Sequence, residues 1–108
     1  MNHDEIINAA AEHFNVRPCD ILGPGREKSR IRMRFITAAL VRERLDVSYT
    51  ELARILGYRD HTSAMHAVRH ARLKREANQR WSDDFSAIER ALLTWREEAE
   101  IEKLEIGA

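Results

Sequence analysis

Cysteine, proline and glycine are scarce in this sequence of 108 residues, which contains one, two and four of them respectively. A single cysteine cannot form an internal disulfide, so the sequence is not that of a disulfide-stabilised secreted scaffold and fits a reducing cytoplasm. Cys19 lies close to Ile21 and Leu22 in the sequence, and we expect it to be a buried structural thiol. The rarity of proline and glycine leaves long uninterrupted segments, which favour an all-helical fold.

Long apolar runs are missing as well. No stretch approaches the roughly 18 apolar residues that indicate a membrane-spanning helix, and the polar N-terminus does not match a signal peptide. The sequence shows no strand pattern of any length and no internal repeat. A chain of this length forms one domain with one core. We therefore predict an all-α, single-domain cytoplasmic protein with no membrane partner.

Charge of one sign is in excess only locally, because the formal net charge is zero, with 18 basic and 18 acidic residues. Residues 26–44 carry seven basic and two acidic side chains, and residues 59–80 carry six and two. Residues 81–108 reverse the sign, with three basic and eight acidic side chains. A neutral total argues against a nucleic-acid partner, but binding depends on the local field. We therefore expect one cationic face on an otherwise neutral molecule.

Apolar residues recur at helical spacing in several segments. The pattern predicts a first helix capped within residues 2–5, a short turn or helical piece at 17–22, and a loop at 23–29. A long helix then runs to about residue 45, and Ser82 is the expected N-cap of the last helix.

Residues 48–76 have the pattern of two helices joined by a very short turn. Ser48 and Glu51 have the capping-box spacing at the start of the first helix, and Gly57 supplies a permissive residue at its end. Asp60 is a good N-cap for the second helix, because its carboxylate can accept the free backbone N–H groups of the first turn. This arrangement is typical of a helix-turn-helix motif.

The second helix of this motif has two different faces. At about 100° per residue, small apolar residues share one side, namely Ala64, Val68 and Ala71. Polar residues that can form hydrogen bonds share the opposite side, namely Thr62, His66 and Arg69. The helix therefore has one side to bury and one side to present to a partner.

The segment at residues 57–67, Gly-Tyr-Arg-Asp-His-Thr-Ser-Ala-Met-His-Ala, resembles the signature of domain IV, the C-terminal DNA-binding domain of the bacterial replication initiator DnaA. The resemblance extends without gaps from about residue 6 to residue 92. It implies a compact, Trp-repressor-like helical domain in the nucleoid that binds double-stranded DNA. Sequence-specific binding at DnaA-box-like sites, regulating replication initiation or transcription, is the function that it implies.

The same resemblance implies roles for individual residues. Contacts to bases are implied for the start of the second helix and for one loop arginine in the minor groove, namely Asp60, His61, Thr62, Ser63 and Arg26. Contacts to phosphate are implied for Lys28, Ser29, Arg42 and Arg59. Two simpler readings stay open: Asp60 is only a cap with His61 at the rim, and the loop at residues 23–29 is an ordinary solvated basic loop.

The sequence departs from the family pattern at several positions. Tyr58 stands where the family has a second turn glycine, and Ser63 stands where it has a second threonine. Residues 32–35 read Arg-Met-Arg-Phe instead of Arg-Pro-Arg-Gln. These departures affect the exact DNA target more than the expectation of DNA binding.

Nothing in the sequence indicates an enzyme. The loop at residues 23–29 imitates a phosphate-binding P-loop, but Glu27 occupies the place before Lys28 where such a loop needs glycine. His66 and His70 are four residues apart without a patterned third ligand, so we expect no metal site. We expect no catalytic residue and no cofactor. The length leaves no room for the ATPase module of a full initiator, so a stand-alone protein is expected.

Residues 94–108 lie mostly beyond the family resemblance. We assign residues 1–93 to the DNA-binding domain and residues 94–108 to an acidic, helical C-terminal extension, because Trp95 and Ala99 continue the apolar spacing. This extension is expected to pack on its own domain or on a second copy, forming a homodimer; fraying of the acidic end is the alternative, because helix C-termini favour cations. The competing function for the whole chain is a protein-interaction module that keeps the fold.

Overall fold

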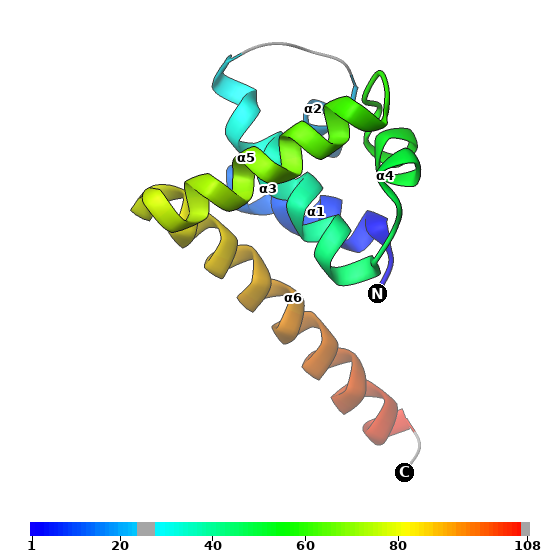
Figure 1. Ribbon diagram of the computed structural model, residues 1–108. Coiled ribbons are helices and arrows are strands. Elements are labelled where there is room, and N and C mark those ends of the chain that lie inside the picture. Colours follow the sequence, from blue (N-terminus) through cyan, green and yellow to red (C-terminus); the bar gives the residue numbers. More distant parts are fainter. Residues whose placement is uncertain (24–27, 107–108) are drawn as a thin grey trace.

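The computed structural model describes the backbone of residues 1–23 and 28–106, and the side chains of these residues except Ser29 and residues 95–106. The described part consists of helices joined by short connections, and it contains no strand. The helices are α1 (His3–Phe14), α2 (Pro18–Ile21), α3 (Lys28–Leu45), α4 (Tyr49–Leu56), α5 (His61–Ala77) and α6 (Gln79–Ile106). The predicted all-α fold class is thereby confirmed (Figure 1).

Helix α1 begins where the sequence predicts, and it ends at a left-handed asparagine. The Asn2 side chain accepts a hydrogen bond from the Glu5 backbone N–H (2.9 Å), which satisfies one of the free donors of the first turn. Asn15 ends the helix in the left-handed conformation (φ 56°), one that asparagine tolerates better than most residues. Ile6 and Ile7 are buried, so α1 contributes one apolar side to the core.

Helix α3 lies at the centre of the molecule and contacts each of the other helices. Helix α5 crosses it on one side, with α1 on the other (Figure 1). The core combines small residues on α3 and α5 with larger ones on the surrounding helices. Its fully buried members include Ala38, Ala39, Leu40, Leu52, Leu56, Ala64, Ala67, Val68, Phe85 and Ile88.

The start of α6 differs from the prediction. The helix begins at Gln79 and is capped by Asn78, whose side chain accepts from the Trp81 backbone N–H (3.3 Å). The prediction that Ser82 is the cap was wrong, and Ser82 lies inside the first turn. Asparagine caps as well as serine does, and the earlier start brings Trp81 into the core.

Cys19 was also predicted wrongly, because the structure places it at the surface. Helix α2 has a single turn, and Ile21 is its one buried residue. A one-turn helix can turn only a narrow side towards the core, and Ile21 occupies that side. Cys19 is therefore a solvent-exposed thiol.

Ion pairs link the C-terminal parts of α3 and α5 to each other and to α6. Glu43 on α3 lies 3.4 Å from Arg72 and 3.7 Å from Arg75, both on α5. Glu89 on α6 lies 2.8 Å from Arg75 and 3.3 Å from Arg44. Each such partly exposed pair is worth about 1 kcal/mol or less. Their larger effect is to neutralise arginines that belong to the basic segments at residues 26–44 and 59–80.

Beyond the core, α6 continues as a helix to Ile106 and leads away from the other helices (Figure 1). Leu92 is the last buried residue whose side chain is described. The expected packing of the extension concerns side chains outside the described part, so it stays a prediction.

The core arrangement predicts a large loss of stability for Phe85→Ala. Phe85 is fully buried (0% exposed) on the side of α6 that faces the core. Truncating a buried phenylalanine typically costs about 3–5 kcal/mol, because apolar contacts are lost and a cavity remains. Urea unfolding monitored by circular dichroism measures the free energy of unfolding. Leu73→Ala is the matched control, since Leu73 is 68% exposed and its truncation should change stability by about 0.5 kcal/mol or less. Equal losses for both variants would contradict this core.

Candidate nucleic-acid interface

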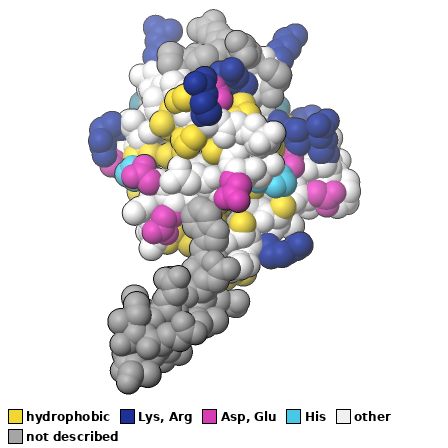
Figure 2. Space-filling view, turned by 180° about the vertical axis from the view of Figure 1, so that it is seen from behind, with side chains coloured by type: hydrophobic (Ala, Val, Ile, Leu, Met, Phe, Trp, Pro, Cys, Tyr) yellow, Lys and Arg dark blue, Asp and Glu magenta, His cyan; other side chains and the backbone are white. Residues whose placement is uncertain are grey.

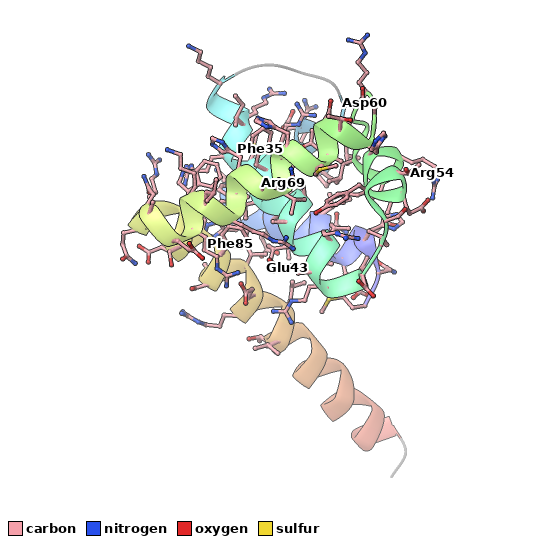
Figure 3. The ribbon with its side chains drawn as sticks, viewed as in Figure 1. Phe35, Glu43, Arg54, Asp60, Arg69 and Phe85 are labelled. Carbon is pink, nitrogen blue, oxygen red and sulfur yellow. The ribbon has the colours of Figure 1, made fainter. Side chains whose placement is uncertain are left out.

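Helix α4 and the turn after it form as the sequence predicts. The Ser48 hydroxyl accepts from the Glu51 backbone N–H (3.1 Å), and Gly57 ends the helix with a φ of 77°. Positive φ values of this size suit glycine, which has no Cβ. Only half of the expected capping box is present, because the Glu51 carboxylate pairs with Arg54. Arg54 lies on the side of α4 that faces away from α5 (Figure 3).

Asp60 is the N-cap of α5. Its carboxylate accepts from the Ser63 backbone N–H (2.9 Å), which confirms the predicted N-cap. This hydrogen bond holds the pKa of the Asp60 carboxyl below its usual range, with smaller contributions from the nearby positive charge of Arg59. Asp60 is therefore ionised at neutral pH. One carboxylate oxygen serves the helix, which leaves acceptor capacity on the other for a partner.

The two faces of α5 are separated as predicted. Its buried residues are all small or medium-sized, namely Ala64, Ala67, Val68 and Ala71. The opposite side is exposed and polar, with His61, Thr62, His66 and Arg69 in contact with solvent and Ser63 half-buried. Asp60 and Arg69 mark this side along the helix in Figure 3. The implied base-contacting residues of α5 thus lie together at its first turn.

Four positions were implied to contact phosphate. Lys28 is exposed at the start of α3, and Arg59 is exposed just before the Asp60 cap. Arg42 is half-buried: it donates to the Val47 carbonyl and lies over the Tyr49 ring, 4.2 Å from its centroid. The Ser29 side chain, like Arg26 in the loop, lies outside the described residues.

Charge is distributed unevenly around the molecule. Several arginines of the basic clusters are held by internal partners, including Arg32 with Asp84, and Arg72 and Arg75 with Glu43. By contrast, Lys28, Arg59 and Arg69 form no ion pair with any residue that the structure describes. The face opposite α5 mixes acidic, basic and apolar side chains, with most of its basic side chains near the outline (Figure 2). Arg80 and Arg90 on α6 likewise form no ion pair with a described residue, so the turn and the outer side of α5 hold some of the unpaired cations.

A histidine and aromatic cluster supports the middle of α5. The rings of His66 and His70 lie 6.1 Å apart, and the Phe35 ring meets both edge-on. Burial lowers the pKa of His70, aided by the nearby charge of Lys74. No group of three potential metal ligands occurs among the residues that the structure describes. Both histidine rings pack against Phe35 on the side of the helix.

Tyr58 and Arg34 are two residues whose positions the sequence did not predict. The Tyr58 hydroxyl is buried and has no hydrogen-bond partner within the described structure. The Arg34 guanidinium lies 5.3 Å from the Tyr58 ring centroid. The sequence did signal that this position is unusual, because Tyr58 stands where the family has a turn glycine. It did not reveal that the Tyr58 ring packs against Arg34.

A short capped helix, a glycine turn and a second helix with a polar outer face define a helix-turn-helix domain. The family model described as "Bacterial dnaA protein helix-turn-helix" matches residues 3–70, and the chain belongs to this family. No helix in the described part is long and apolar enough to cross a membrane.

Curated relatives support this assignment. The chain is 34% identical over 89 residues to the chromosomal replication initiator protein DnaA of Cereibacter sphaeroides, which covers 82% of this chain and 20% of that protein. It is 38% identical over 63 residues to DnaA of Thermomicrobium roseum, covering 58% of this chain and 14% of the relative. DnaA of Ruegeria sp. is 33% identical over 89 residues. The chain spans about a fifth of the length of its first relatives.

The buried phenol of Tyr58 predicts a specific pH dependence of stability. Burial raises the pKa of Tyr58 to about 12, against 10.0 for the free phenol. The folded protein thus keeps a proton that the unfolded chain releases above pH 10. The stability that Tyr58 contributes through this proton is therefore fully present below pH 10 and is lost as the pH rises towards 12. Each pKa unit corresponds to about 1.4 kcal/mol. Between pH 10 and 12, we expect the unfolding free energy of Tyr58→Phe to fall by about 2–3 kcal/mol less than that of the wild type. Parallel denaturant titrations measure this difference, with Tyr49→Phe as control; identical slopes for Tyr58→Phe and wild type would contradict it.

Proposed function

We propose that this chain binds duplex DNA sequence-specifically at DnaA-box-like sites and so regulates replication initiation or transcription, without hydrolysing ATP. Helix α5 enters the major groove, which is wide enough to admit an α-helix. The single observation that carries the proposal is the capped, polar first turn of α5, beside cations that have no internal partner. Membership of the DnaA helix-turn-helix family supports it.

Roles within the proposal follow from side-chain chemistry. The Asp60 carboxylate accepts from an exocyclic amine, and Thr62 offers a methyl group to thymine or a hydroxyl to a base edge. His61 and Ser63 complete the reading surface. Lys28, Ser29, Arg42 and Arg59 bind phosphates, which orients the protein without reading sequence.

The loop contributes a second groove contact in this proposal. Arg26 enters the minor groove, where a narrow A·T-rich segment concentrates negative potential and rewards an arginine. Lys28, the first residue of α3, binds the adjacent phosphate backbone of the DNA. Contacts in two grooves on one side of the duplex would set both the register and the orientation of the protein on the DNA.

Substitutions at Thr62 and Arg59 separate base reading from phosphate binding. Thr62→Ala should weaken binding to the preferred site by about 1–3 kcal/mol and leave random duplex almost unaffected. Arg59→Ala should weaken both duplexes equally and lower the log–log salt slope by about 0.9. Arg59 is a cleaner probe than Arg42, whose loss also removes its bond to Val47. Fluorescence anisotropy with a selected site and a random duplex, across a salt series, gives both quantities.

The outcome of this comparison distinguishes the proposal from its main competitor. If both variants lower specific and random binding by the same factor, α5 is a non-specific basic surface. If the wild-type chain binds no duplex at low salt, a protein-interaction module that keeps the fold becomes the better account. Thermal melts of each variant exclude unfolding as the cause.

We also propose that residues 1–93 form the complete DNA-binding unit and that residues 94–108 are an appended extension. Leu92 is the last described residue in the core, and the later turns of α6 lead away from it. Truncation after Thr94 should change duplex affinity by about 0.5 kcal/mol or less. Sedimentation velocity of both forms tests the homodimer, which predicts that the truncated form has half the mass. A large loss of affinity in a truncated monomer would contradict the boundary.

A further inference from the structure

Arg34 occupies an interior position between two segments that are distant in sequence. It lies in α3 and is only 7% exposed. Its Nε–H donates to the Ile21 carbonyl (3.0 Å), at the end of α2, and its guanidinium lies 5.3 Å from the Tyr58 ring centroid. A guanidinium at this distance from an aromatic ring is attracted to its face. Arg34 therefore ties the segment after α2 to the turn of the helix-turn-helix.

A second contact joins the same two segments through the backbone. The Gly23 N–H donates to the carbonyl of Leu56 (3.0 Å), and Leu56 is the last residue of α4. A Cβ placed on Gly57 would lie 2.8 Å from the Gly23 nitrogen, closer than real side chains approach. We call this set, made of Arg34, Tyr58 and the Gly23–Leu56 hydrogen bond, the turn clasp.

The turn clasp holds the beginning of the recognition helix. Asp60, the cap of α5, comes only two residues after Tyr58. Binding groups act specifically only when their positions are held within about 0.5 Å and 10–20°. A turn released from the clasp would still present its cations to phosphates, but Asp60 and Thr62 would no longer meet base edges in register.

We propose that Arg34 is a positioning residue for sequence reading, which acts through the turn clasp and not by contact with DNA. This inference rests on the proposed function. Its interior location distinguishes it from Arg59, which is exposed one residue after Tyr58. An arginine whose hydrogen bond and ring contact are both internal contributes to specificity, not to the electrostatic part of binding.

The matched pair Arg34→Met and Arg59→Met tests the proposal. Arg34→Met should lower the ratio of specific to random duplex affinity by about tenfold while leaving the salt slope unchanged. Arg59→Met should leave that ratio unchanged and lower the slope by about 0.9. A phosphate ligand at Arg34 would behave like Arg59, so a lower slope with an unchanged ratio for Arg34→Met overturns the proposal.

A second pair keeps the test valid if Arg34→Met does not fold. Tyr58→Leu removes the ring but keeps an apolar side chain of moderate size, and it should lower the specificity ratio as Arg34→Met does. Tyr58→Phe keeps the ring and should retain the wild-type ratio. Folded Tyr58→Leu with the wild-type ratio overturns the role of the turn clasp.

Amide hydrogen exchange in the free protein separates this inference from the proposed function. The Gly23 amide should exchange slowly in the wild type and faster in Tyr58→Leu, while the amides of α3 keep their protection. Unchanged exchange at Gly23 overturns the clasp whatever the DNA result. If the wild type shows no sequence preference on any duplex, the proposed function fails, and the role of Arg34 in sequence reading fails with it.

Discussion

The packing of α5 on α3 is the constraint on which the rest of the structure depends. Small residues on both helices are fully buried, including Ala38 and Ala39 on α3 and Ala64 and Ala67 on α5. Helices that meet through such residues approach closely, since the separation of two axes depends on the side chains between them. This contact decides which side of α5 faces solvent. It also places Phe35, His66 and His70 in one cluster beside the outer side of α5.

Electrostatics then divides the arginines into two groups. Those near the ends of α3 and α5 pair with Glu43 and Glu89, so they help to hold the helices together. Those around the turn and the outer side of α5 remain available to a partner. A chain with zero net charge can thus present a local positive field, because some of its acidic residues pair with arginines elsewhere, such as Arg32, Arg44, Arg72 and Arg75. The first relatives are about four times as long as this chain, so the function of the whole relatives does not transfer directly.

Much of the local structure was predictable because its causes are local. Asn2, Ser48 and Asp60 cap the helices that the spacing predicts, and Gly57 ends α4 with a positive φ. The errors arose where a local rule allowed two answers. Asn78 and Ser82 are both good caps, and only the burial of Trp81 selects the first. Cys19 lies close to Ile21 and Leu22, which suggested burial, but the one-turn helix α2 buries only Ile21.

The sequence by itself determined the caps of α1, α4 and α5, the apolar side of α5 and the motif at residues 57–67, since each follows from contacts within a few residues. Only the tertiary structure decided which cations are neutralised and which groups Arg34 contacts. Ion pairs such as Arg75–Glu89 and contacts such as Arg34–Tyr58 join segments that are distant in the chain. No periodicity encodes such pairs, because they depend on how the helices cross. The same reason hides the approach of Gly23 to Gly57, which exists only when α2 and the turn are brought together.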